Sequence, residues 1–225
     1  MTHTYSLFDT ELQRLRSATI AMAELVLRQV ERAVDAIVTE DPARIAQVLA
    51  EEKEVNRMHL QTDQLCNRMI AKMQPIAADL REILAALHMN NDLERVGDEA
   101  KKIAKKARDL GPRPLPIGTA RIEQMAGLAC EMLRLAIDAY RRQDADAARA
   151  LIGRDDEVDD LRDELTRELV SVMSTAPGGI SQGLSLIFVV QSLERVGDHA
   201  TNLAESVLLA VEGSREKPAK VKTEG

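Results

Sequence analysis

One hexapeptide occurs twice in this sequence, and its repetition constrains the fold more than any other feature. Leu-Glu-Arg-Val-Gly-Asp stands at residues 93–98 and again at 193–198. Other matches accompany it in the same order: Met22-Ala23 with Met125-Ala126, Glu54-Val55 with Glu157-Val158, and Pro75 with Pro177. Six identical residues within a matching pattern of breaks are not a chance event. We therefore interpret the chain as two copies of one structural unit.

The sequence between the breaks is typical of long helices. Apolar residues recur with the helical period, and strand-type residues never form alternating runs. Trp is absent and only two Tyr and two Phe occur, so we expect a core of aliphatic side chains, Ala and Met. Prolines at 42, 75, 112, 114, 116 and 177 predict helix boundaries. The expected helices cover about residues 6–40, 42–73, 77–109, 118–142, 145–175 and 179–212.

These helices predict an all-α fold of two tandem, duplicated three-helix bundles, because long helices joined by short turns pack as antiparallel neighbours. Residues 1–110 form the first predicted repeat and residues 119–212 the second. A proline-rich linker at 111–118 joins them, and a charged tail at 213–225 follows.

The charge and cysteine content bear on partners and compartment. A net charge of −7 argues against broad contact with nucleic acid, although Lys101, Lys102, Lys105 and Lys106 form a local basic cluster. Cys66 and Cys130 have no Cys or His at ligand spacing, so we expect buried thiols in a reducing compartment. No signal peptide or membrane span is evident, and we expect a cytoplasmic protein.

Each repeat carries two polar pairs at a spacing of four residues. The repeated motif supplies one pair in each repeat, Glu94 with Asp98 and Glu194 with Asp198. Each of these residues comes directly after a residue of the apolar stripe, so the pair lies at the edge of the core face. On the preceding helix, Glu52 with Asn56 and Asp155 with Asp159 occupy an equivalent edge.

Chain distances predict that these pairs meet. Asn56 and Glu94 each lie 19 residues from Pro75, and Glu52 and Asp98 each lie 23 residues from it. The corresponding distances around Pro177 are 18 and 17, then 22 and 21. If each hairpin turns near its proline, four oxygen-bearing side chains converge in each repeat.

Two interpretations of this convergence remain open. Clustered carboxylates repel one another, and a bound cation such as Mg²⁺, Mn²⁺, Ca²⁺ or iron relieves the repulsion. Alternatively, neighbouring Arg95, Arg195, Lys101 and Lys102 neutralise the acids, and the edges are solvated and metal-free.

His88 and His199 are expected to be surface or core residues. No nucleophile–base pair, Glu-x-x-His motif or phosphate-binding glycine loop occurs, so we do not expect an enzyme; a metal-dependent hydrolase is the disfavoured alternative.

The sequence resembles the PhoU family over about residues 5–212. The resemblance rests on the duplicated ERVGD, the elements from Glu52 to Asn56 and from Asp155 to Asp159, Gln74-Pro75, and the three-plus-three helix layout. This resemblance implies a cytoplasmic negative regulator of phosphate uptake that acts between the high-affinity phosphate transporter, with its ATPase, and the sensor histidine kinase of phosphate starvation. It also implies homodimers that reach the membrane only through partners, and metal ions at E/D-x-x-x-D motifs.

Carried over by position, the resemblance assigns two metal sites. The first acidic site contains Glu52, Asn56, Glu94 and Asp98, and the second contains Asp155, Asp159, Glu194 and Asp198. Asn56 stands where a full acidic motif has Asp, and it contributes no charge. We therefore predict that the second site binds metal more strongly. The metal's identity among Mg, Mn and Fe stays open, and a metal-free helical adaptor is the alternative.

Overall fold

The computed structural model describes residues 2–110 and 115–213, and these residues form helices without a strand. The helices are α1 Thr2–Thr39, α2 Pro42–Met73, α3 Ala77–Asp109, α4 Thr119–Arg142, α5 Ala145–Ile152, α6 Asp155–Thr175 and α7 Ile180–Glu212, with a short 3₁₀ turn η1 at Pro177–Gly179. The predicted all-α fold is confirmed. Residues 111–114 of the predicted linker and 214–225 of the predicted tail lie outside the described residues, and the domain boundaries stay a prediction.

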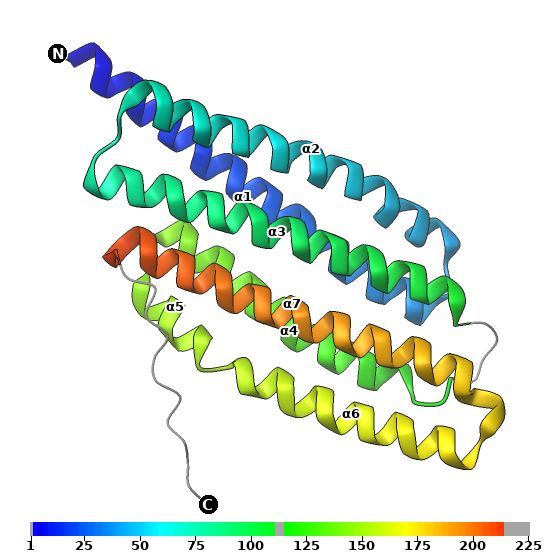
Figure 1. The fold of residues 1–225 in the computed structure, drawn as a ribbon. Coiled ribbons are helices and arrows are strands. Elements are labelled where there is room, and N and C mark those ends of the chain that lie inside the picture. The colour runs from blue at the N-terminus through cyan, green and yellow to red at the C-terminus, as the bar shows by residue number, and fades with distance from the viewer. Residues whose placement is uncertain (1, 111–114, 214–225) are drawn as a thin grey trace, which may run out of the picture.

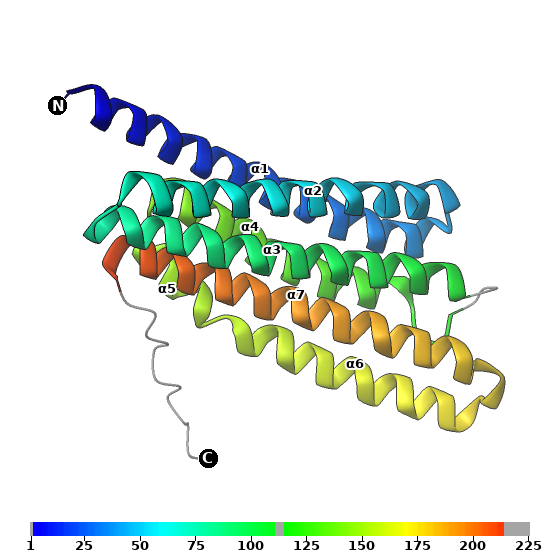
Figure 2. The same ribbon diagram turned by 45° about the horizontal axis from the view of Figure 1, so that its top comes forward.

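The helices form an elongated bundle in which α1, α2 and α3 lie on one side and α4 to α7 on the other (Figure 1). Both views place α3 and α7 side by side along the middle of the molecule (Figure 2). The main buried cluster includes Val26 and Leu93 from the first repeat and Leu133 and Leu193 from the second. The two repeats therefore bury their apolar faces against one another and share one core.

Local signals explain most helix ends. Asp41 caps α2, its side chain accepting a hydrogen bond from the amide of Ala43, and Pro42 occupies the first turn. Asp144 caps α5 in the same way through the amide of Ala147. Gln74 and Gln143 end α2 and α4 with φ of 49° and 55°, a left-handed geometry that stops a helix.

The fifth expected helix differs from the prediction because it is interrupted. α5 ends at Ile152, and α6 begins at Asp155, with Gly153 and Arg154 between them. Glycine is a weak helix former, and the three acids at 155–157 favour a new helix start because they face its positive end. The break leaves Asp155 in the first turn of α6, at the end of the second acidic site.

The repeated motif lies on the buried faces of α3 and α7. Leu93, Ala100, Leu193 and Ala200 are fully buried, as the apolar stripe predicts. A Cβ at Gly97 would stand 3.1 Å from the side chain of Val55, and one at Gly197 would stand 3.3 Å from Val158. Each glycine thus lets the preceding helix approach closely, at equivalent positions of the two repeats.

Two further expectations concern individual core residues. Tyr140 is an aromatic residue within the expected aliphatic core, with 2% of its surface exposed. Cys66 and Cys130 are buried free thiols, as predicted, and burial raises the pKa of each to about 12. They therefore behave as small apolar residues and not as nucleophiles.

Candidate functional site

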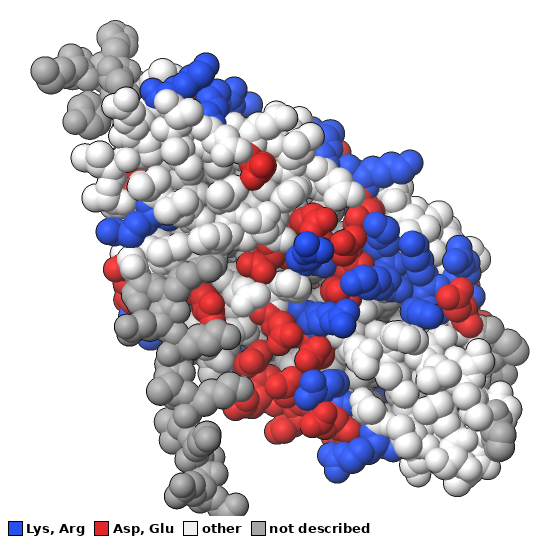
Figure 3. Space-filling model, in the orientation of Figure 1, with Lys and Arg blue, Asp and Glu red and all other residues white. Residues whose placement is uncertain are grey.

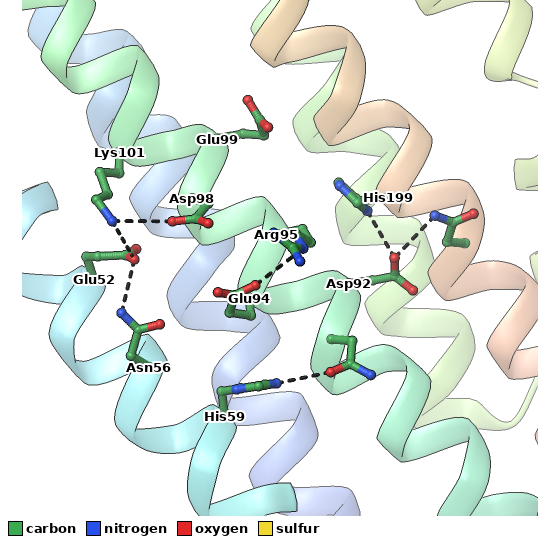
Figure 4. A network of polar contacts seen from close by, with 12 residues as sticks. Glu52, Asn56, His59, Asp92, Glu94, Arg95, Asp98, Glu99, Lys101 and His199 are labelled. Carbon is green, nitrogen blue, oxygen red and sulfur yellow. Dashed lines mark hydrogen bonds and ion pairs between the residues drawn. The ribbon is translucent and has the colours of Figure 1, made fainter.

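In the first repeat, a lysine joins the polar residues of α2 and α3. Lys101 donates hydrogen bonds of 3.1 Å to Oε1 of Glu52 and 3.3 Å to Oδ1 of Asp98 (Figure 4). The same Oε1 accepts a bond of 3.1 Å from the amide of Asn56. The hydrogen bond to Glu52 raises the pKa of Lys101, with a further contribution from Asp98. The ammonium group therefore supplies the positive charge between the two carboxylates.

Glu94 is the member of the first acidic site that stands apart from this network. Its carboxylate forms an ion pair of 3.6 Å with the neighbouring Arg95, as the metal-free interpretation suggested (Figure 4). The structure thus brings Glu52, Asn56 and Asp98 together through Lys101 and gives Glu94 a separate counter-charge.

A buried glutamine from α1 also reaches the first site. Gln29 is fully buried, and its amide nitrogen donates a bond of 3.0 Å to the carbonyl of Val48. Its Oε1 and the Oε2 of Glu52 are both buried without a hydrogen-bond partner. Both atoms lie within 3.4 Å of the point where a Cβ on Gly97 would stand. Two buried acceptors without a donor favour a donor or a cation beside them, so these residues fit a bound cation.

In the second repeat, an arginine forms ion pairs with two of the acidic residues. Arg162 of α6 lies 3.0 Å from Glu194 of α7 and 3.6 Å from Asp159 on its own helix. Asp155 instead accepts a bond of 3.2 Å from the hydroxyl of Thr201. The structure therefore joins Asp159 to Glu194 through Arg162, and it links Asp155 to α7 one turn beyond Asp198.

The acids of the second repeat interact with one another. Loss of hydration raises the pKa of Glu194, and nearby Asp198 raises it further. Loss of hydration also raises the pKa of Asp198, although the residue as a whole is exposed, and the carboxylates of Asp155 and Asp159 add to the rise. The four carboxylates thus share one region, and their mutual repulsion is only partly relieved by Arg162.

The two sites differ at one decisive position. Counted from the repeated motif, Lys101 corresponds to Thr201, so a charged group in the first repeat is replaced by a neutral hydroxyl in the second. Within residues 2–110 and 115–213, no three His, Cys, Asp or Glu side chains already stand together as metal ligands. Metal binding therefore requires side chains to rotate, with Lys101 or Arg162 moving away. The assignment of either site to a metal stays a prediction.

Polar contacts between the repeats were not predicted from the sequence. Asp92 accepts bonds of 3.0 Å from His199 and 3.2 Å from Asn202, which join α3 to α7 (Figure 4). Arg195 forms an ion pair of 3.6 Å with Glu99 of α3, and its charge also acts on Glu194, as the metal-free interpretation expects. The sequence does show that these positions differ between the repeats: Asp92 corresponds to Ser192, and His199 corresponds to Glu99. This difference could have indicated contacts that are specific to one repeat.

Comparison with known proteins identifies the family. The model of the PhoU domain matches residues 19–107 and 122–207, one stretch in each repeat. The chain belongs to the PhoU family. It is 38% identical over 213 residues to the phosphate-specific transport system accessory protein PhoU homolog of Pseudomonas putida, covering 94% of this chain and 83% of that protein. The homolog from Pseudomonas aeruginosa is also 38% identical, with 94% and 88% covered.

Solved PhoU structures have the same fold. The crystal structure of PhoU from Pseudomonas aeruginosa aligns with a TM-score of 0.88 at 38% identity, covering 92% of this chain and 100% of that one. The phosphate transport system regulatory protein PhoU from Streptococcus pneumoniae aligns with a TM-score of 0.86 at 24% identity, covering 93% and 99%, which supports the fold alone. Among the described residues of this PhoU-family chain, no helix is long and apolar enough to cross a membrane.

Proposed function

We propose that this chain is a cytoplasmic regulator of phosphate-specific transport, which represses uptake and phosphate-starvation signalling. It acts between the transport ATPase and the sensor histidine kinase, as a homodimer. The observation that carries the proposal is membership of the PhoU family, supported by 38% identity over 94% of the chain to a transport-system accessory protein. The role is one of interaction and not of catalysis.

Metal binding is the second part of the proposal. The second acidic site binds a divalent or iron-type cation through the oxygens of Asp155, Asp159, Glu194 and Asp198. The raised pKa values of Glu194 and Asp198 support this: loss of hydration is the larger cause and neighbouring carboxylates add to it, and an added cation relieves both. The first acidic site binds more weakly because Lys101 already supplies a positive charge to Glu52 and Asp98.

Metal titration of the purified, chelator-treated protein tests this part. Wild type is compared with Glu194→Gln/Asp198→Asn and with the matched pair Glu94→Gln/Asp98→Asn. We expect Mn²⁺ to raise the melting temperature of wild type and of the Glu94/Asp98 variant, but not of the Glu194/Asp198 variant. If no metal among Mn²⁺, Mg²⁺ and Fe²⁺ binds wild type, the chain is instead a metal-free helical adaptor.

Partner binding is tested separately, by capturing the phosphate-transport ATPase and the cytoplasmic part of the sensor kinase on the immobilised chain. We expect both to be retained, and sedimentation of the chain alone to give a dimer. Retention of neither partner would overturn the regulatory proposal, whatever the metal titration gives.

A further inference from the structure

The first half of α7 presents apolar side chains to solvent. Ile180, Leu184 and Phe188 are 45%, 48% and 51% exposed, and their spacing of four residues places them on one face. We call these three residues the α7 apolar stripe. Further along the same face the exposed residues are polar, beginning with Gln191 and Arg195. Apart from Val211 near its end, which is 37% exposed, the exposed large apolar side chains of α7 lie at the start of the helix.

α3 ends close to the stripe. The two helices run antiparallel: Asp92 of α3 contacts His199, and Lys106 lies over the ring of Phe188. α3 ends at Asp109, before it reaches the level of Ile180. In the first repeat the corresponding positions on α3 are half-buried, as at Leu84.

Basic side chains border the stripe. Lys106 stands 4.7 Å from the centre of the Phe188 ring, a cation–π contact, and Lys105 is exposed without an ion pair among the described residues. Lys102 and Arg108 are also exposed on α3, but each is already ion-paired on the same helix, with Glu99 at 2.7 Å and with Asp109 at 3.6 Å. Figure 3 shows Lys and Arg gathered over the end of α3, next to an uncharged area over the start of α7.

We infer that the α7 apolar stripe and the basic end of α3 form a docking surface for an acidic amphipathic helix of a partner protein. The stripe extends over nine residues, or about 12 Å of helix, which matches two turns of a partner's apolar face. Acidic residues flanking that face would lie against Lys105 and Lys106. The surface is separate from both acidic sites and does not depend on metal.

The charge of the whole molecule favours a helix over an anionic membrane. The chain carries a net charge of −7, and acidic side chains lie close to the basic edge (Figure 3). A flat anionic bilayer would meet those acids together with the lysines, and repulsion would offset the attraction. A single helix, which is only about 10 Å wide, contacts the stripe and the lysines alone.

The test uses two synthetic amphipathic helices that share one leucine face, with Glu on the polar face of one and Lys on that of the other. Their binding to the full chain is measured by fluorescence anisotropy. We expect the Glu peptide to bind at least about tenfold more tightly than the Lys peptide, because of the basic edge. Equal binding of the two peptides, or binding of neither, would overturn the inference.

Matched variants locate the binding surface. Leu184→Ser/Phe188→Ser removes the apolar contact, and Lys105→Ala/Lys106→Ala removes the charge; each should weaken Glu-peptide binding about tenfold. The controls are Leu60→Ser/Leu135→Ser and Lys53→Ala/Lys72→Ala, which alter exposed residues elsewhere and should leave binding unchanged. Equal losses in the controls would overturn the inference.

Two other occupants are distinguished in the same series. Tighter binding to phosphatidylglycerol vesicles than to the Glu peptide would replace the partner helix with a membrane. Dissociation of a dimer by Leu184→Ser/Phe188→Ser, measured by sedimentation, would assign the stripe to contact between copies of this chain. Both results would overturn the inference, and neither would affect the proposed regulatory function.

Discussion

The ammonium group of Lys101 on α3 lies 3.1 Å from Oε1 of Glu52 on α2, a carboxylate with only 5% of its residue surface exposed. In the second repeat Thr201 takes the place of Lys101, and its hydroxyl lies 3.2 Å from Asp155. The two copies of one unit thus satisfy their acidic residues differently, with an internal cation in one and a neutral donor in the other.

Replacing this cation tests its role. Lys101→Thr leaves Glu52 buried without a counter-charge, so we expect a loss of about 1–3 kcal/mol in the free energy of unfolding in the presence of chelator. The same change should strengthen Mn²⁺ binding at the first acidic site. Urea denaturation and metal titration measure the two effects, with Lys53→Thr at an exposed position as the control. An unchanged stability would mean that Lys101 does not compensate the charge of Glu52.

Stability should depend on pH through Asp198. Its pKa is raised in the folded protein, so the folded state holds its proton more tightly than the unfolded state does. The resulting stabilisation is present at low pH and is lost as pH rises through the raised pKa. Without metal, Asp198→Asn should therefore be more stable than wild type at neutral pH, by about 0.5 kcal/mol, and the difference should shrink towards about pH 4.

Urea denaturation in chelator between about pH 4 and pH 7 measures this difference. Saturating Mn²⁺ should reverse its sign at neutral pH, because wild type keeps a charged ligand at position 198 and the variant has only a neutral amide oxygen there. A constant difference across the pH range would contradict the role assigned to Asp198.

The two motif glycines should respond unequally to substitution. A Cβ at Gly97 meets Val55 at 3.1 Å and Gln29 at 3.3 Å, whereas at Gly197 the three nearest atoms all belong to Val158, from 3.3 Å. Alanine gains about 1 kcal/mol of helix propensity at either position. We expect Gly97→Ala to be destabilising by about 1–2 kcal/mol net, and Gly197→Ala to be nearly neutral. The urea denaturation midpoints of the two variants measure these changes in stability. A larger loss of stability for Gly197→Ala than for Gly97→Ala would contradict the closer packing at Gly97.

The contact of Asp92 with His199 should hold the repeats together. Asp92→Ala removes the acceptor for both His199 and Asn202, and we expect a loss of about 1–3 kcal/mol. A double-mutant cycle with His199→Ala isolates the pair, because the two changes should not add. Additive losses would mean that the residues stabilise the fold independently.

Much of the fold follows from local features of the sequence. Pro42 predicts a helix boundary because its effect acts within one turn, and the repeated motif predicts two equivalent buried faces. The interruption at Gly153 was missed, because a single glycine is tolerated inside many helices and only the surrounding packing decides whether the helix continues.

The sequence by itself determined the duplication, most of the helices and the placement of a polar pair on each side of each hairpin. The rise per residue and the position of each turn set the level at which these residues meet. Only the tertiary structure decided which partner each acidic side chain contacts. Three contacts each join two different helices: Lys101 with Glu52, Arg162 with Glu194, and Asp92 with His199. Such pairings depend on how packed helices are rotated and shifted against one another, and that is set by the whole core. The tertiary structure thus separated two sites that the repeated motif makes look alike.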